Sequence, residues 1–204
     1  MRSLCVRLTF TEDLLGTANS DPDIHEEFIA SKAPDAPSRE EEIAAIGKDE
    51  AIKKSKTIFH RDEHDNPILF NYMFKGHFKD ACGMLARLTG TKSKELKAYK
   101  KIIDGLIFVY PRKVLIHFDG QIGSNQRPLR ASTPQGERIA LVNSETIPAG
   151  AYVDIEIQCL CDDHCNVVEE WLNYGSLRGI GQWRNAGYGS YTWEKLSQWQ
   201  GAAI

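Results

Sequence analysis

The sequence contains no apolar run that approaches the length of a membrane-spanning helix, and its first residues lack the pattern of a secretory signal peptide. Its five cysteines are odd in number and unevenly spaced, which argues against a disulfide framework and indicates free thiols. We therefore expect a cytoplasmic protein with no membrane partner. Apolar residues make up 42% of the chain, and its 204 residues suit one globular domain spanning residues 1–204.

The motifs of common nucleotide-binding and hydrolytic enzymes are also missing. There is no Gly-Lys-Ser/Thr of a P-loop and no nucleophile elbow of a serine hydrolase. Residues 159–165 (CLCDDHC) offer thiol and imidazole ligands, but zinc sites pair two separated knuckles, whereas these ligands lie within seven residues. We expect no cofactor and no metal, and we interpret these cysteines as buried structural thiols, with a metal site as the less favoured alternative.

Charge is unevenly distributed along the chain, although the net charge is only −3. Residues 12–50 carry twelve acidic and three basic side chains, a balance of −9, whereas residues 51–140 carry seventeen basic and eight acidic side chains, a balance of +9. A basic middle is where a polyanion would bind, and solvated charged faces are the alternative interpretation. Residues 20–55 are interpreted as an acidic, partly helical insertion or flap.

Hydrophobic patterning predicts a mixture of strands and helices. Apolar residues alternate along residues 3–10 and 153–160, which predicts half-buried strands, and they recur at helical spacing along residues 74–88 and 164–174, which predicts amphipathic helices. Gly175 follows as the residue that ends the second helix. The remaining segments are predicted as a lysine-rich helix over 91–101, strands over 105–111, 113–118, 139–147 and 190–196, and a turn-rich patch over 119–138. This order is compatible with an α+β, ferredoxin-like (RRM-like) split βαβ core with insertions.

Glycine is concentrated in residues 177–193 (LRGIGQWRNAGYGSYTW), in the pairs Gly179/Gly181 and Gly187/Gly189. A dinucleotide fingerprint needs Gly-x-Gly-x-x-Gly after a strand and before a helix, whereas here a helix is expected before the glycines and a strand after them. Glycine permits positive φ and a close approach of the backbone to another group. The stretch therefore predicts a loop that holds a ligand or, alternatively, a glycine-rich hairpin or bulge.

Basic and aromatic side chains lie among these glycines. Arg178 and Arg184 could pair with phosphates, and Trp183 and Tyr188 could stack on bases. The alternative places Trp183 in the hydrophobic core. Both residue types are those expected of a surface that binds single-stranded nucleic acid.

Three separated stretches, residues 60–87, 127–157 and 179–193, resemble segments of the RAMP superfamily of ferredoxin-like RNA-binding proteins. The likeness is greatest to the backbone subunit of type III CRISPR effector complexes. It is carried by the Lys75-Gly76 start of a helix, the Pro148-Ala149-Gly150 turn and the glycine-rich loop before the last strand. The chain departs from that pattern at Tyr72-Met73-Phe74, where small serines are usual, and in its acidic insertion, which fits a stand-alone member borne by a phage or mobile element.

The resemblance implies that the chain binds single-stranded RNA and associates with CRISPR effector subunits or, head-to-tail, with further copies of itself. The residues expected to contact RNA are basic side chains and the glycine-rich loop: Lys75, Lys79, Arg127, Arg130, Arg138, Arg178, Gly179, Gly181, Trp183, Arg184, Gly187 and Gly189.

Two other functions remain open at this point. The acidic residues 20–55 could imitate nucleic acid, which would make the chain a protein-binding, anti-CRISPR-like mimic of a CRISPR subunit. A metal-dependent ribonuclease would use Asp21 or Asp23, and metal-free cleavage would use a histidine such as His77, but no pattern pairs these residues with partners. We therefore expect a binding protein more than an enzyme.

Overall fold

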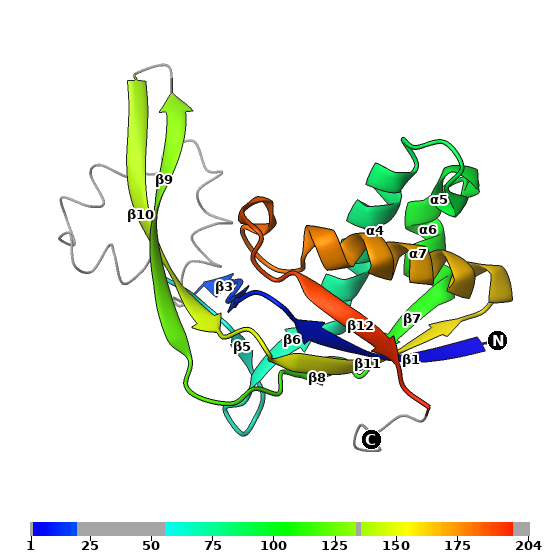
Figure 1. The fold of residues 1–204 in the computed structure, drawn as a ribbon, viewed down its shortest axis with the longest axis horizontal. Helices are drawn as coiled ribbons and strands as arrows, with labels where there is room; N and C mark the ends of the chain where they lie inside the picture. The colour runs from blue at the N-terminus through cyan, green and yellow to red at the C-terminus, as the bar shows by residue number, and fades with distance from the viewer. Residues whose placement is uncertain (1, 20–55, 134–135, 198–204) are drawn as a thin grey trace, which may run out of the picture.

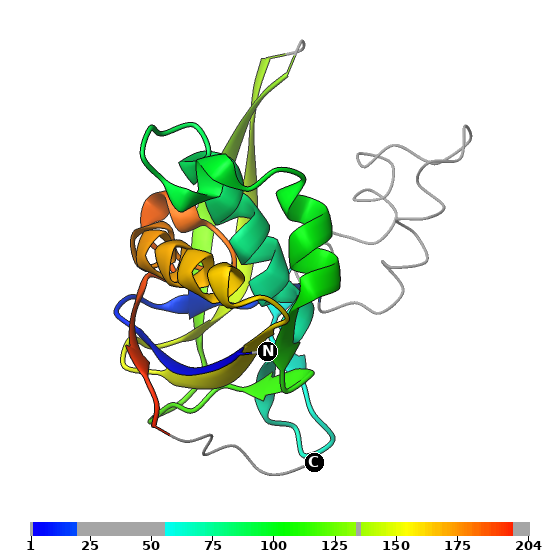
Figure 2. The same cartoon turned by 90° about the vertical axis from the view of Figure 1, so that its right-hand side faces the viewer.

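The computed structural model describes residues 2–19, 56–133 and 136–197, together with their side chains except those of residues 128–141 (Figure 1). The chain forms a four-stranded sheet with helices on one face and a long β-hairpin that projects to one side (Figures 1 and 2). The α+β class predicted from the sequence is thus confirmed. Within the described ranges, no helix is both long enough and apolar enough to cross a membrane. The predicted acidic insertion lies outside the described residues.

The four-stranded sheet is antiparallel throughout and has the order β12-β1-β11-β7. Its strands are β1 (Arg2–Phe10), β7 (Ile107–Tyr110), β11 (Tyr152–Cys159) and β12 (Tyr191–Lys195). The alternation read from the sequence places Val6 and Leu8 of β1 on the buried face beside Ile155 of β11. The predicted half-buried strands at residues 3–10 and 153–160 are therefore confirmed.

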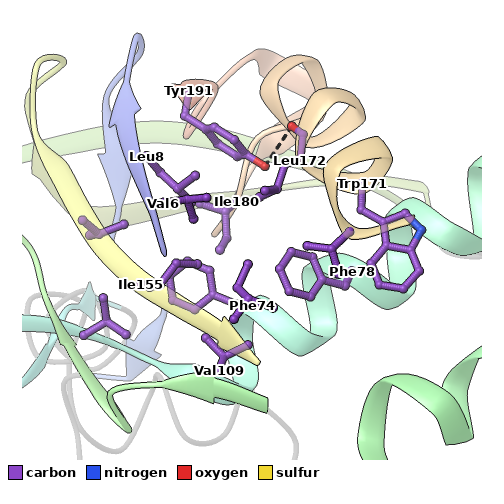
Figure 3. Packing of buried hydrophobic residues seen from close by; sticks show 14 of the residues in the cluster. Val6, Leu8, Phe74, Phe78, Val109, Ile155, Trp171, Leu172, Ile180 and Tyr191 are labelled. Atoms are coloured by element: carbon purple, nitrogen blue, oxygen red, sulfur yellow. Dashed lines mark hydrogen bonds between the residues drawn. The ribbon is translucent and has the colours of Figure 1, made fainter. Parts of the chain in front are cut away.

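Two long helices cover this face of the sheet, α4 (Asn71–Leu85) and α7 (Asp162–Arg178). Phe74 and Phe78 of α4 are fully buried in the same cluster as Trp171 of α7, and the Phe78 and Trp171 rings lie 5.7 Å apart (Figure 3). Burying each of these side chains contributes roughly 1.5–3 kcal/mol. The core between the sheet and these helices fixes where α4, α7 and the loop after α7 lie relative to each other.

Two smaller sheets lie beside this core. One has the order β2-β10-β4-β3 with β9 paired to β10, and the other has the order β5-β6-β8. Their strands are β2 (Leu14–Leu15), β3 (Ala18–Asn19), β4 (Thr57–Ile58), β5 (His60–Arg61), β6 (Pro67–Phe70), β8 (Lys113–Leu115), β9 (Gly123–Thr133) and β10 (Gly136–Ile147).

The prediction of a turn-rich patch over residues 119–138 was wrong. Most of it forms β9, which pairs with β10 from Gly123↔Thr146 to Thr133↔Gly136. Glycine, serine, asparagine and Pro128 read locally as turn residues. In the described residues β9 pairs only with β10, so β9 is an edge strand, and an edge strand tolerates a proline. The pairing of β9 with β10 therefore outweighs the preference of these residues for turns.

Two predicted helices also differ from the structure. The lysine-rich helix is divided into α5 (Lys92–Glu95) and α6 (Tyr99–Leu106), because Ala98 between them is left-handed, with φ of 54°. Helix α7 does not end at Gly175 but continues to Arg178, and Gly179 follows with φ of 75°. Gly175 therefore lies inside the helix. A glycine is needed at this position because a side chain there would overlap Tyr191 and His77.

Candidate nucleic-acid interface

The glycine-rich loop after α7 is folded back on itself. Gly179 and Gly189 have positive φ of 75° and 69°, and the amide of Ile180 donates to the carbonyl of Gly189 at 3.0 Å. A Cβ on Gly179 would lie 2.5 Å from the Tyr188 carbonyl oxygen, and one on Gly189 would overlap the Ile180 carbonyl. The close approach that these two glycines permit is therefore made with the loop's own backbone.

The other two glycines face different surroundings. A Cβ on Gly181 would lie 3.3 Å from Leu14 Cδ1 of β2, so this glycine fits the loop against the neighbouring sheet. Gly187 has φ of 92°, but a Cβ there would meet nothing within 4 Å. Of the four predicted contact glycines, Gly187 is the one whose surroundings are open.

Arg178 and Arg184 converge on one acidic side chain from α4. The Asp80 Oδ2 oxygen accepts from Arg184 Nη1 at 2.8 Å and from Arg178 Nε at 3.2 Å. Arg178 also donates to the Asn185 Oδ1 oxygen at 2.6 Å. The two arginines predicted to hold phosphates are thus oriented by an internal counter-ion. The three side chains, here called the Asp80 cluster, keep a net charge of +1.

Trp183 lies between a cation and an aromatic ring. The Arg127 Cζ atom is 4.2 Å from its ring centroid, and the Tyr188 ring stacks on it at 5.4 Å with an interplanar angle of 12°. The indole is 36% exposed, so it is neither inserted in the core nor free in solvent. Asn125 of β9 donates to the Tyr188 hydroxyl at 2.7 Å, which fastens the loop to the base of the hairpin.

Arg127 is a cation buried without a carboxylate. It is 5% exposed and donates to Ser144 Oγ at 3.3 Å and to Gln182 Oε1 at 3.2 Å. No acidic side chain among the described residues pairs with it, and its Nε has no hydrogen-bond acceptor there. Burial lowers the pKa of this guanidinium. A buried, unpaired positive charge favours the approach of an anion.

Three successive amides of the loop lack an acceptor within the described residues. In the described part of the chain, no acceptor is found for the amides of Gly181, Gln182 and Trp183. Trp183 is left-handed, with φ of 54°, and begins the short 3-10 turn η1 (Arg184–Ala186). Successive backbone amides without an internal acceptor are a general anion-binding feature of such loops.

Lys75 and Lys79 lie on α4 but are bound to the neighbouring helix α6. The Lys75 ammonium donates to the Asp104 carbonyl at 3.1 Å and lies 5.1 Å from the Phe108 ring centroid. The Lys79 ammonium pairs with the Asp104 carboxylate at 2.6 Å. Burial lowers the pKa of the Lys75 ammonium. The structure therefore gives these lysines a helix–helix contact and does not join them to the Asp80 cluster.

Arg130 and Arg138 lie in the hairpin, opposite Ile139 and Ala131 respectively. This part of the hairpin projects away from the helices (Figure 1). The structure does not describe the side chains of these two arginines, so their contact with RNA stays a prediction.

His77, the histidine named as a candidate for metal-free cleavage, is buried. It is 4% exposed, and its Nε2 lies 2.9 Å from the hydroxyl of Tyr191, which itself donates to the Leu172 carbonyl at 3.3 Å. Burial, together with the positive charge of the nearby Arg184, lowers the pKa of His77 to about 4. The imidazole fills the space that Gly175 leaves in α7, so this candidate for metal-free cleavage lies inside the protein.

One residue of this site, Asp80, carries no signal in the sequence. Asp80 occupies a polar position of an amphipathic helix pattern, as a solvent-exposed acid would, and only the packing of α4 against α7 brings it to the arginines.

The described residues hold no group of three or more histidine, cysteine or acidic side chains that could bind a metal. Cys159 and Cys165 are buried, as expected of structural thiols, whereas Cys161 is exposed. Asp21 and Asp23 lie outside the described residues.

No protein-family model and no curated protein matches the chain. Its fold is similar to that of a chain in the type III-B Cmr-beta complex bound to cognate target RNA, with a TM-score of 0.53 and 11% identity over 96% of this chain. That match covers 60% of the Cmr-beta chain, so this protein spans less than two thirds of it. A chain of a type IV-B CRISPR complex matches with a TM-score of 0.52 and 11% identity over 100% of this chain and 94% of its own length. The protein thus has the fold of subunits found in CRISPR complexes.

Proposed function

We propose that the chain is a RAMP-like, CRISPR-associated subunit that binds single-stranded RNA where the glycine-rich loop meets the base of the β9–β10 hairpin. A cytoplasmic location and association with effector subunits, or with further copies of the chain, belong to the same proposal. The similar fold of chains in two CRISPR complexes, one of them bound to target RNA, supports it.

The topology supports a ferredoxin-like core. Helix α4 follows the first strand of the four-stranded sheet, α7 follows the third, and the strand order is β12-β1-β11-β7. This is the β-α-β-β-α-β arrangement of a split βαβ unit. The segments between these elements are then insertions, and one of them contains the hairpin.

One observation carries the proposal. Arg127 of β9, Arg178 of α7 and Arg184 of η1 are distant in sequence but gather around the segment 182–185, with Asp80 as their one acidic partner among the described residues. Guanidinium groups bind phosphates in a fork geometry, and the Trp183 and Tyr188 rings beside them offer stacking surfaces. This combination suits a polyanion that carries bases.

Binding of a labelled single-stranded RNA should be measured by fluorescence anisotropy at several salt concentrations. We expect the double variant Arg178→Ala/Arg184→Ala to bind about 10- to 100-fold more weakly. The slope of log Kd against log salt should fall by about 0.7 for each phosphate that the variant no longer neutralises. Arg87→Ala is the matched control, since Arg87 is exposed at the far end of α4. If the wild type fails to bind RNA even at low salt, the proposal is lost.

The charge distribution favours a second candidate, a protein-binding mimic of a CRISPR subunit. Residues 12–50 have a balance of −9, and Asp80 already neutralises one of the loop arginines. Such a chain would bind a basic protein surface rather than RNA. Capture of effector subunits by the wild type, and its loss when Glu40, Glu41 and Glu42 are changed to glutamine, would favour this candidate.

A further inference from the structure

A row of aromatic rings crosses the surface from β5 to the first turn of α4, away from the Asp80 cluster. The rings of Phe70 and Tyr72 stack at 5.5 Å with an interplanar angle of 16°, and the ring of His60 meets Phe70 edge-on at 4.8 Å. Tyr72 is at the end of the row and is 58% exposed. One face of its ring lies on Phe70, and the opposite face is therefore open to a ligand.

An exposed basic residue, Arg112, lies next to the segment that carries the ring. The amide of Asn71 donates to the Arg112 carbonyl at 3.0 Å, which places Arg112 beside the start of α4. The Arg112 side chain is exposed and pairs with no acidic group in the described ranges. Lys75, one helical turn after Tyr72, is held by the Asp104 carbonyl, and the first turn of α4 contains no acidic residue. Arg112 is therefore the cation that a phosphate next to the ring would meet, since the neighbouring Lys113 is paired with Glu63.

Phe70 also limits the freedom of the tyrosine. A side chain held against a neighbouring ring loses less conformational entropy on binding than a free one. Planar stacking on an open aromatic face accepts any base, because every base has a π-face. A protein partner would need a wider apolar surface than one aromatic ring, and the adjacent Arg112 cation favours an anionic ligand.

We propose that Tyr72 is a stacking platform for a nucleobase of single-stranded RNA, with Arg112 beside it for the adjoining phosphate. The inference rests on the proposed function and adds a second RNA contact, separate from the glycine-rich loop.

The test compares two labelled oligomers of equal length, an oligoadenylate and an abasic ribose-phosphate chain, by fluorescence anisotropy. We expect Tyr72→Ala to weaken oligoadenylate binding about 5- to 100-fold and to leave abasic binding unchanged, because stacking needs a base. Tyr72→Phe keeps the ring and should bind like the wild type. Leu88→Ala is the control for loss of an exposed apolar side chain, since Leu88 is 55% exposed beyond the other end of α4.

A second measurement follows the base itself. An oligomer carrying 2-aminopurine should lose fluorescence on binding the wild type, and Tyr72→Ala should restore it. Equal oligoadenylate binding by wild type and Tyr72→Ala, or an equal weakening on the abasic chain, overturns the platform while leaving RNA binding by the glycine-rich loop intact. If the wild type binds neither oligomer, the proposed function and this inference fall together.

Discussion

Asp80 of α4 and Arg184 of the glycine-rich loop are joined by a 2.8 Å ion pair, and the same carboxylate oxygen holds Arg178. The arginines that the sequence predicts as free phosphate ligands therefore have a counter-ion inside the protein. A phosphate that binds there must displace Asp80 or share the arginines with it. The strength of RNA binding should depend on this carboxylate.

The first prediction concerns Asp80→Asn. Removing the negative charge raises the charge of the trio from +1 to +2, so RNA binding should become about 2- to 10-fold tighter at low salt, with the gain shrinking as salt rises. Stability should fall by about 1 kcal/mol or less, because these groups are partly exposed. Asp119→Asn, at an exposed acid, is the control. An unchanged Kd at low salt would show that RNA does not use these arginines.

A second prediction compares two glycines of the loop, of which one is needed for its backbone conformation alone and the other also for close contact with a neighbouring backbone group. Gly187 and Gly189 both have positive φ, but only Gly189 lies against another carbonyl. Gly187→Ala should lower the free energy of unfolding by about 1–2 kcal/mol, the cost of a left-handed alanine. Gly189→Ala should lower it by about 3 kcal/mol or more, because the methyl group also overlaps Ile180. Urea denaturation measures both, and equal effects would contradict the fold of the loop.

A third prediction tests the contact between hairpin and loop. A double-mutant cycle of Arg127→Ala and Trp183→Ala should give a coupling energy of about 0.5–2 kcal/mol, from the cation–π contact. Arg127→Lys keeps the charge but loses the planar guanidinium, so most of the coupling should disappear in that variant too. Arg7→Ala, on a different sheet, should combine additively with Trp183→Ala. Additive effects of Arg127→Ala and Trp183→Ala would mean that their stacking does not join the two segments.

A fourth prediction concerns pH. Burial lowers the pKa of His77 to about 4 in the folded protein, whereas the unfolded chain has the ordinary value of 6.5. As pH falls from 6.5 towards 4 the unfolded state takes up the proton first, so this histidine favours unfolding increasingly. The contribution, absent above pH 6.5, should reach about 3 kcal/mol near pH 4. Denaturation of His77→Gln across this range should show a correspondingly flatter profile, and an identical slope would contradict the burial.

The fold was predictable where the pattern of apolar residues was regular. Residues 3–10 and 153–160 alternate, and both form central strands because one face of each meets the helices. The prediction for residues 119–138 failed because turn-forming residues such as Pro128 are tolerated at the edge of a two-stranded pairing. The prediction for Gly175 failed because an interior helix glycine, kept to make room for His77, has the same local appearance as a helix-ending glycine.

The site was predictable only in part. The sequence brought Arg178, Trp183 and Arg184 together because they are neighbours in one loop. It assigned Arg127 to the same surface by resemblance, and the structure places that arginine on Trp183. The role of Asp80 could not be predicted, since nothing in a helical sequence pattern distinguishes a solvent-exposed acidic residue from one that pairs with two arginines.

By itself the sequence determined the α+β class, the main strands and helices, and the loop rich in glycine, arginine and aromatic residues, because these depend on local periodicity and composition. Only the tertiary structure decided what each of these side chains touches. It directed three glycines against the protein's own chain, assigned Lys75 and Lys79 to Asp104, and paired the loop arginines with Asp80. Those contacts join residues distant along the chain, and the packing of α4 and α7 on the sheet is what brings them within reach.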